Sequence, residues 1–274
     1  MSIITLLTDF GTEDAYAGIM KGVILSTTPS AVIIDITHHI DPQDIIQAAY
    51  LIKTSYRYFP EGTVHVIVVD PEVGSDRAIV ALDMMGHIFL APDNGVLTLV
   101  MEEGKIDSIV RVENTRYFLK AVSRTFHGRD IFAPVAAHLC RGMDIRNLGS
   151  PLDQQNLVHL NIDKPCVSGK DLLVGTVVCF DRFGNCISNI DATHLKKIYA
   201  SNSSRMLIIK IGKTSIKGVS LSYADAEPNR PLAIMGSFGY LEIALNQGNA
   251  RRALQIAKGD IITLEYGQET HSEK

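Results

Sequence analysis

The stretch that decides the fold is His65-Val66-Ile67-Val68-Val69-Asp70-Pro71-Glu72-Val73-Gly74-Ser75-Asp76-Arg77. Its apolar part is rich in β-branched residues and stops at Asp-Pro, which is typical of a strand buried on both faces of a parallel sheet. Open α/β sheets bind ligands at the carboxyl ends of their strands, so Asp70 and the turn that carries Arg77 are candidates for a site. The alternative is an ordinary aspartate that caps the next turn.

Two similar units precede this stretch. Residues 3–7 and 31–36 are short apolar runs that end in polar residues, which predicts strands. Residues 17–25 and 44–58 carry apolar side chains at helical spacing. The order strand, helix, strand, helix, strand is typical of an α/β domain with a mostly parallel sheet.

The chain continues in the same way after Arg77. We predict strands over 78–83, 87–91 and 108–113, and helices over 95–103 and 132–141. The segment Phe126-His127-Gly128-Arg129-Asp130 then lies in a loop that leads into a helix N-terminus. Free N–H groups at such a terminus favour an anion or developing negative charge.

Between Asn147 and Lys170 the periodicity fades, and glycine and proline interrupt a polar stretch. We predict an α/β domain over 1–150, a linker over 151–168 and a second domain over 169–274. Short β-like segments make up the second domain, so we expect a small β-barrel, with a sandwich as the alternative. One helix is predicted over 241–246. The β-like segments are residues 172–180, 206–211, 215–221, 232–235 and 261–266.

The composition is that of a soluble globular protein, with 46% hydrophobic and 20% charged residues. A net charge of −4 offers no basic face, so we expect no nucleic-acid partner. No apolar run approaches the ~18 residues of a membrane span, and no signal peptide precedes the first strand, so we expect no membrane partner. The four cysteines form no CxxC pair and are expected to be reduced, which favours the cytoplasm.

Two familiar kinds of site lack support. No GxGxxG follows the first strand, so the dinucleotide fingerprint is missing. His38 and His39, with Asp35 and Asp41, could hold a metal, but side chains at adjacent strand-end positions diverge. We therefore expect no metal, and keep a metal-dependent hydrolase that uses the two histidines as an alternative.

Two segments of the second domain suit a flat ligand. In Asp181-Arg182-Phe183-Gly184-Asn185 the glycine lets backbone approach, Phe183 can stack and Asn185 can bond a ring edge. Gly236-Ser237-Phe238-Gly239-Tyr240-Leu241-Glu242 supplies small residues and a hydroxyl at the expected helix start. Each segment alone could be an ordinary turn. In the first domain the polar candidates at strand ends and before a helix are Asp9, Asp70, Arg77, Asn94 and His127.

Taken together, these segments resemble the S-adenosylmethionine (SAM) hydroxide adenosyltransferases, or SAM hydrolases, which are relatives of the fluorinase and chlorinase enzymes. The resemblance runs in order from about residue 3 to residue 246, so it covers both domains. It rests on Leu7-Thr8-Asp9-Phe10-Gly11-Thr12, Asp35-Ile36-Thr37-His38, Val68-Val69-Asp70-Pro71-Glu72-Val73-Gly74, Ala91-Pro92-Asp93-Asn94-Gly95, Thr125-Phe126-His127-Gly128-Arg129-Asp130, Asp181-Arg182-Phe183-Gly184-Asn185 and Ser237-Phe238-Gly239-Tyr240-Leu241-Glu242.

The resemblance implies a Rossmann-like α/β domain followed by a β-barrel. It implies a homotrimer in which each site lies between the first domain of one subunit and the second domain of its neighbour. The implied reaction is attack of a water-derived hydroxide on C5′ of SAM, which yields adenosine and L-methionine. No cofactor is implied, because SAM is the substrate. The alternatives are a module that binds adenosine or SAM without chemistry, and halide-dependent adenosyl transfer.

The resemblance also implies the roles of individual residues. Asp70, Arg77 and His127 match the catalytic Asp-Arg-His set of the family, and Asp9 matches the residue that holds the ribose hydroxyls. Asn94 is assigned to substrate binding as well. The remaining positions are Phe183 and Tyr223, which flank adenine, Asn185, which hydrogen-bonds it, and Asp181, Ser237 and Glu242, which hold the methionine end.

Several positions depart from the fluorinase pattern. Gln43 stands in place of a tryptophan, Asp70 in place of a tyrosine and Gly128 in place of the halide-contacting serine. The long insertion that the fluorinase carries after the Asp70 turn is absent. These departures favour hydroxide over halide, and we assign Gln43 and Gly128 to substrate binding. Glu72 stands where the family usually has glycine after Asp70-Pro71.

Overall fold

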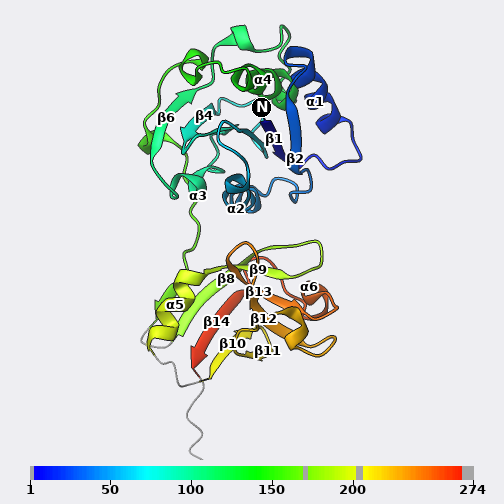
Figure 1. Ribbon diagram of the computed structural model, residues 1–274, viewed down its shortest axis with the longest axis vertical. Helices are drawn as coiled ribbons and strands as arrows, with labels where there is room; N and C mark the ends of the chain where they lie inside the picture. The colour runs from blue at the N-terminus through cyan, green and yellow to red at the C-terminus, as the bar shows by residue number, and fades with distance from the viewer. Residues whose placement is uncertain (1–2, 169–171, 202–205, 267–274) are drawn as a thin grey trace, which may run out of the picture. The chain divides into compact units, whose positions relative to one another are not determined.

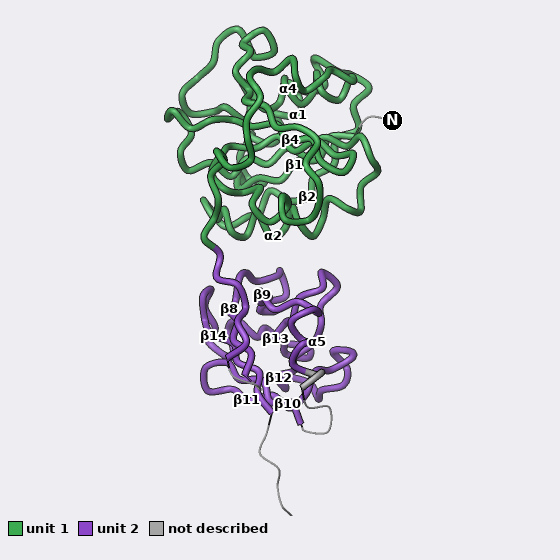
Figure 2. The backbone as a smooth tube through the Cα atoms, turned by 90° about the vertical axis from the view of Figure 1, so that its left-hand side faces the viewer, with its two compact units in different colours: residues 1–161 green, residues 162–274 purple. Residues whose placement is uncertain are grey.

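The computed structural model describes residues 3–168, 172–201 and 206–266, and the chain divides into two compact units. Unit 1 comprises residues 1–161 and unit 2 residues 162–274 (Figure 2). The division falls inside 151–168, the segment predicted as a linker. The predicted start of the second domain at residue 169 lies outside the described residues.

Unit 1 is built on a six-stranded sheet. Its strands are β1 (Ile3–Thr8), β2 (Val32–Thr37), β3 (Val64–Val68), β4 (Ile79–Met84), β5 (His87–Pro92) and β6 (Ile106–Arg111). Their order across the sheet is β2-β1-β3-β5-β4-β6. Figure 1 labels β1 and β2 toward one side of the sheet and β4 and β6 toward the other. The pairs β1–β2, β1–β3 and β3–β5 are parallel, and β4 runs antiparallel to both of its neighbours. The prediction of a mostly parallel sheet is confirmed.

Helices cover both faces of this sheet (Figure 1). The helices are α1 (Tyr16–Thr27), α2 (Ile45–Ser55), α3 (Thr98–Met101) and α4 (Ala133–Cys140). Helices α1 and α4 pack together on one face, and α2 and α3 pack together on the other. A π-helical turn, Gly128–Phe132, leads into α4. Short 3₁₀ turns are Tyr56–Tyr58, Thr115–Tyr117, Ile145–Leu148 and Gln154–Asn156.

The predicted helix over 95–103 is much shorter in the structure. Only Thr98–Met101 is α-helical. Gly95 has a φ of +90°, and Thr98 N donates to its carbonyl, so the first residues form a turn. A left-handed residue cannot continue into a right-handed helix, and α3 begins after it.

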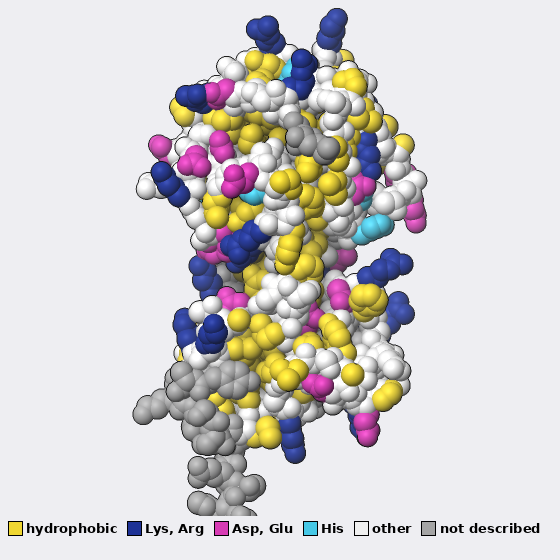
Figure 3. Space-filling model, in the orientation of Figure 1, with side chains coloured by type: hydrophobic (Ala, Val, Ile, Leu, Met, Phe, Trp, Pro, Cys, Tyr) yellow, Lys and Arg dark blue, Asp and Glu magenta, His cyan; other side chains and the backbone are white. Residues whose placement is uncertain are grey.

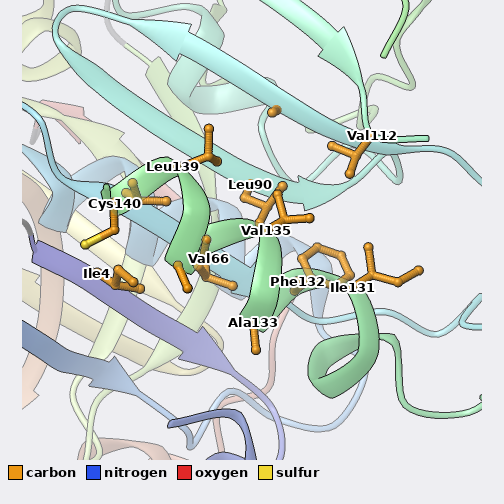
Figure 4. Packing of buried hydrophobic residues seen from close by; sticks show 14 of the residues in the cluster. Ile4, Val66, Leu90, Val112, Ile131, Phe132, Ala133, Val135, Leu139 and Cys140 are labelled. Atoms are coloured by element: carbon orange, nitrogen blue, oxygen red, sulfur yellow. The ribbon is translucent and has the colours of Figure 1, made fainter. Parts of the chain in front are cut away.

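The core of unit 1 explains the unbroken apolar run that precedes Asp70. All five residues of β3 are buried, because helices cover the sheet on both faces. On the α4 side, Ile4 and Val66 from neighbouring strands pack with Phe132 and Val135 (Figure 4). The carboxyl end of β3, which leads into Asp70, is therefore held by packing on both faces of the sheet.

Unit 2 contains an antiparallel, nearly closed, barrel-like sheet of eight strands. The strands are β7 (Cys166–Ser168), β8 (Leu172–Phe180), β9 (Cys186–Asp191), β10 (Leu207–Ile211), β11 (Thr214–Lys217), β12 (Pro231–Met235), β13 (Tyr240–Leu245) and β14 (Ile261–Tyr266). Their order is β11-β10-β14-β8-β9-β13-β12, and β7 pairs with β8. A bridge between Ser220 and Ile234 links the two ends of this order. The prediction of a β-barrel is confirmed.

The predicted helix over 241–246 is wrong. Residues 240–245 form β13, a central strand between β9 and β12. Leu and Ala favour helix intrinsically, but every residue of β13 is buried. Leu241 and Ile243 pack into one cluster and Ala244 into another, which is the period of a strand. Packing on both faces outweighs the helical propensity.

A helix that the sequence did not predict follows β9. Helix α5 (Ala192–Ser201) begins where Oδ1 of Asp191 accepts the N–H groups of Thr193 and His194. Leu195 is buried on its inner face. The cap is a typical helix start, whereas the apolar stripe is short. Unit 2 also contains α6 (Ala250–Ala253) and the 3₁₀ turn Tyr223–Asp225.

Charged side chains of both signs are spread over both units on the face drawn in Figure 3. Hydrophobic side chains reach the surface between them. Among the described residues, no helix combines the length and the apolar character needed to cross a bilayer.

Candidate functional site

Asp70 and Arg77 form a buried ion pair in the turn that follows β3. Nε of Arg77 lies 2.8 Å from Oδ1 and 2.9 Å from Oδ2 of Asp70, and Nη2 also contacts Oδ2. The Arg77 side chain is 5% exposed and that of Asp70 is 4% exposed. A guanidinium that contacts both carboxylate oxygens fixes the orientation of the carboxylate as well as its charge.

His127 completes this cluster from a loop fifty residues further along the chain. Its Nδ1 lies 3.0 Å from Nη2 of Arg77. Burial and the positive charge of Arg77 lower the pKa of His127, and the charges of Asp70 and Asp130 only partly oppose this. The imidazole is therefore neutral at pH 7. Since Arg77 can only donate, Nδ1 accepts and the ring proton resides on Nε2.

Backbone packing brings the turn and the loop together. Gly74 has a φ of +83°, and a Cβ at this position would lie 2.2 Å from the carbonyl oxygen of Arg124. Only glycine fits such a close approach. On the other side of the loop, the fully buried Asp130 accepts the N–H of Ser123 at 2.8 Å and Nε of Arg129 at 2.6 Å.

A cavity of about 280 Å³ lies beside this cluster in unit 1. Asp70 and His127 line it, whereas Arg77 does not. Arg77 lies behind the two side chains that it holds. The resemblance implies that all three are catalytic. The structure brings the three together but presents only two of them to the cavity.

Asp9 and Gln43 line the same cavity. Asp9 directly follows β1, and its Oδ2 accepts the backbone N–H of Gln43 at 2.9 Å. Gln43 has a φ of +67°, which is unfavourable for a residue with a side chain. Its backbone conformation thus directs the N–H group toward the Asp9 carboxylate.

Gly128 also lines the cavity, and its surroundings are tight. A Cβ here would lie 3.1 Å from Sδ of Met20, 3.2 Å from the Phe126 ring and 3.4 Å from the Phe10 ring. Any side chain at this position would require these neighbours to move.

Asn94 lines neither this cavity nor the one described below. It is buried, its Nδ2 donates to the carbonyl of Val69 at 2.9 Å, and its Oδ1 accepts the N–H of Val96. In this arrangement Asn94 fixes the chain immediately before Asp70.

Unit 2 contains a larger cavity of about 810 Å³. Phe183 extends beside it and is 74% exposed, so most of its ring is open for stacking. All the candidate residues of the second domain line this cavity: Asp181, Phe183, Asn185, Tyr223, Ser237 and Glu242.

The Asp181 carboxylate is already engaged within its own loop. Oδ1 accepts the N–H groups of Phe183 and Asn185 at 2.9 and 2.8 Å, and Oδ2 accepts Nδ2 of Asn185 at 2.8 Å. Asp181 therefore shapes the turn between β8 and β9. Asn185 retains its carbonyl oxygen and its second amide hydrogen, the pair of groups that bonds adenine edges.

Glu242 is a buried carboxylate in the same cavity. Burial raises its pKa, the Tyr223 hydroxyl opposes this by donating to Oε2 at 3.1 Å, and the charge of Asp181 raises it further. A Cβ on Gly236 would overlap the carboxylate, at 1.7 Å from Oε1. Glycine at this position therefore leaves room for Glu242.

An aromatic cluster in unit 1 was not recognised from the sequence. The rings of Phe10, Tyr16 and Phe126 line the cavity, with centroids between 5.0 and 5.9 Å apart. Phe10 and Phe126 lie inside the quoted segments, but no spacing signal marks Tyr16.

The alternative metal site on His38 and His39 gains no support from the geometry. His38 is buried and contacts Thr8, whereas His39 is exposed and contacts Thr12. Within the described ranges, no three His, Cys, Asp or Glu side chains are grouped to hold a metal ion.

Family models match both units. The model described as "SAM hydroxide adenosyltransferase N-terminal domain" matches residues 4–149, and the one for the C-terminal domain matches residues 175–263.

Full-length relatives and a solved structure agree with these matches. The chain is 35% identical to an (R)-S-adenosyl-L-methionine hydrolase of Methanocaldococcus jannaschii, over 97% of both chains. It is 33% identical to one of Thermus thermophilus, over 94% of this chain and 98% of the other. A more distant fluorinase of Actinoplanes sp. is 28% identical, over 96% and 97%. The crystal structure of a conserved Thermotoga maritima protein superimposes with a TM-score of 0.87 at 36% identity, covering 95% of this chain and 99% of that one.

Proposed function

The chain belongs to the SAM hydroxide adenosyltransferase family, and we propose that it hydrolyses S-adenosyl-L-methionine to adenosine and L-methionine. The observation that carries this proposal is the Asp70–Arg77–His127 cluster beside the cavity of unit 1. The names of the hydrolase relatives support it.

In the proposed reaction, a water molecule attacks C5′ of the substrate in line with the C5′–S bond. The new C5′–O bond forms as the C5′–S bond breaks, and the bonding pair moves to sulfur. Methionine then leaves as a neutral thioether, and the water releases one proton. No metal or cofactor is required, because the sulfonium is already a good leaving group. Placing the water at ~3 Å from C5′ supplies much of the acceleration.

Asp70 is the proposed partner of that water. It lines the cavity, and its carboxylate can accept a hydrogen bond from the water and then its proton. Arg77 holds the carboxylate in place, and His127 contacts the same guanidinium. Because Arg77 contacts both oxygens of Asp70 and so fixes the direction of the carboxylate, we propose that orientation of the water contributes more than proton abstraction.

The remaining candidate residues suit the other parts of the substrate. Asp9 can accept hydrogen bonds from both ribose hydroxyls. Phe183 offers a face for adenine and Asn185 a donor–acceptor pair for its edge. Glu242 can attract the positively charged substrate as long as it is ionised.

We further propose a homotrimer in which the unit 1 cavity of one subunit and the unit 2 cavity of its neighbour together form each site. Each cavity alone presents groups for only part of the substrate, which supports this assembly. A cytoplasmic location is also proposed, supported by a sequence whose four cysteines form no CxxC pair. Analytical ultracentrifugation that gives a monomer in the presence of SAM would contradict the trimer.

The experiment that tests the function is incubation of the purified protein with SAM, with adenosine and methionine followed by chromatography. The proposal expects both products in equal amounts, without added halide. Tight binding of SAM without turnover would instead indicate the alternative, a module that senses the nucleoside. A 5′-halogenated nucleoside formed in the presence of chloride would indicate halide transfer.

A further inference from the structure

His38 belongs to one of the family-like segments, yet its side chain lines neither cavity. It is 4% exposed, and its Nδ1 lies 2.8 Å from the hydroxyl oxygen of Thr8, the last residue of β1. Thr8 is itself fully buried. This contact therefore joins the ends of β1 and β2 in the interior, one residue before Asp9.

The surroundings of the ring determine which way this hydrogen bond points. Nε2 of His38 lies 3.1 Å from Oδ1 of Asp35, whose Oδ2 is held by Nζ of Lys21 at 2.6 Å. A negative carboxylate favours the ring proton on Nε2, so Nδ1 accepts the hydroxyl hydrogen of Thr8. Nε2 and the carboxylate are close but not aligned, and Nε2 has no hydrogen-bond partner among the described residues. Nδ1 therefore makes the directional contact.

Further bonds tie the two loops together around this contact. The N–H of Gly11 donates to the carbonyl of His38 at 2.7 Å, and the N–H of Phe10 donates to the Thr8 hydroxyl at 3.3 Å. The N–H of Gln43 then donates to Asp9. In the sequence, Asp9 thus lies between Thr8, which contacts His38, and Phe10, whose N–H donates to the Thr8 hydroxyl.

We infer that His38 is a positioning residue for nucleoside recognition: through Thr8 it aims the Asp9 carboxylate at the ribose hydroxyls and sets the preference for ribose over deoxyribose. This inference rests on the proposed function, in which Asp9 holds the ribose. His38 touches no substrate atom in this account. Its effect is confined to the geometry of the β1 strand end.

The test compares the affinities of adenosine and 2′-deoxyadenosine, measured by calorimetry, in a set of variants. We expect His38→Leu to reduce the preference for adenosine by about tenfold, the value of one hydrogen bond to a charged group. His38→Asn should retain most of it, because the amide oxygen can occupy the place of Nδ1 and accept from Thr8. The neighbouring exposed residue supplies the matched control, His39→Leu, which should leave the preference unchanged.

Thr8→Val keeps the shape of the side chain and removes the hydroxyl, so it should reduce the preference for adenosine as His38→Leu does. It serves as the test if His38→Leu does not fold. A lower melting temperature with an unchanged affinity ratio in both variants would overturn the inference, since a purely structural residue would behave in this way. Equal loss in His38→Asn and His38→Leu would also overturn it. Because these are binding measurements, their outcome is independent of whether the wild-type protein turns over SAM.

Discussion

Nη2 of Arg77 lies 3.0 Å from Nδ1 of His127. The same guanidinium holds both oxygens of Asp70, so one buried cation connects a turn to a loop fifty residues away. Arg77 does not line the cavity itself. Its proposed contribution is to hold the two groups that do.

Arg77→Lys tests this contribution. A lysine ammonium is a compact charge without the planar fork, so it cannot hold Asp70 and His127 simultaneously. We expect kcat to fall by about a hundredfold, with KM changed much less, because the lost geometry matters chiefly in the transition state. Steady-state kinetics measure both. The exposed Arg116 provides the control, and Arg116→Lys should have wild-type kinetics.

Asp70→Asn removes the carboxylate charge and keeps its size. We expect kcat to fall by about a thousandfold, because the amide NH2 cannot accept from Arg77, which disturbs the orientation of the water, and because the amide cannot take up its proton. The affinity for SAM should be retained. The variant should also be less stable by ~3 kcal/mol, because Arg77 stays buried without its counterion. Asp76→Asn, an exposed change in the same turn, should alter neither property. Unchanged turnover in Asp70→Asn would remove Asp70 from the mechanism.

The affinity for SAM should depend on pH through Glu242. Burial raises the pKa of this carboxylate, so it takes up a proton at a higher pH than an ordinary glutamate. The neutral form no longer attracts the cationic substrate, and KM should rise as the pH falls from 7 toward about 5. Tyr223→Phe removes the hydrogen bond that favours the ionised form and should shift this rise to higher pH.

Glu242→Gln supplies the complementary result. Its KM should be high at every pH and lack the acid-side rise, whereas exposed Glu227→Gln should follow the wild-type profile. A full acid-side rise in Glu242→Gln would assign the titration to another group.

Acid should destabilise unit 1 through His65. Burial, together with the adjacent His87, lowers the pKa of this ring from 6.5 to about 3. Below pH 6.5 the His65 ring takes up a proton in the unfolded chain, whereas in the folded protein it does so only near pH 3. The neutral ring therefore makes its full contribution to the free energy of unfolding above pH 6.5, and this contribution is lost as the pH falls toward 3. This one group contributes a loss of up to ~1.4 kcal/mol per pH unit.

Urea unfolding between pH 7 and pH 4.5 measures this slope. His65→Leu should reduce the slope of the free energy of unfolding against pH, because leucine does not titrate. This holds whatever the effect of the substitution on stability at neutral pH. His159→Leu, a change at an exposed histidine, should leave the slope as it is in the wild type. An unchanged slope in His65→Leu would show that the acid sensitivity arises elsewhere.

The sequence predicts the parts of the site that depend on local rules. The apolar run before Asp70 has the composition of a doubly covered strand, and the seven-residue step to Arg77 is short enough for one turn. The Arg77–His127 contact is different, because it depends on Gly74 packing against the backbone of Arg124. No pattern in the sequence encodes that packing.

The sequence alone does not decide between two possible roles of one residue, such as binding a ligand or forming a hydrogen bond within the protein. Asn94 and Asp181 were expected to bind substrate, and the structure shows their polar atoms bonded within the protein. Residues 240–245 have helical propensity, yet their burial on both faces makes them a strand. Asn94 and residues 240–245 have partners that are distant in the sequence, Val69 and strand β9 respectively. The partners of Asp181 lie within its own loop, where the sequence alone does not show which way the carboxylate turns.

Oxygen-18 labelling can establish whether water is the group that attacks C5′ of SAM in this protein. The purified protein would be incubated with SAM in ¹⁸O-enriched water, and the products analysed by mass spectrometry. Attack by water should place one ¹⁸O atom in the 5′-hydroxyl of adenosine and none in methionine. Adenosine without the label, or turnover only when a halide is supplied, would contradict it.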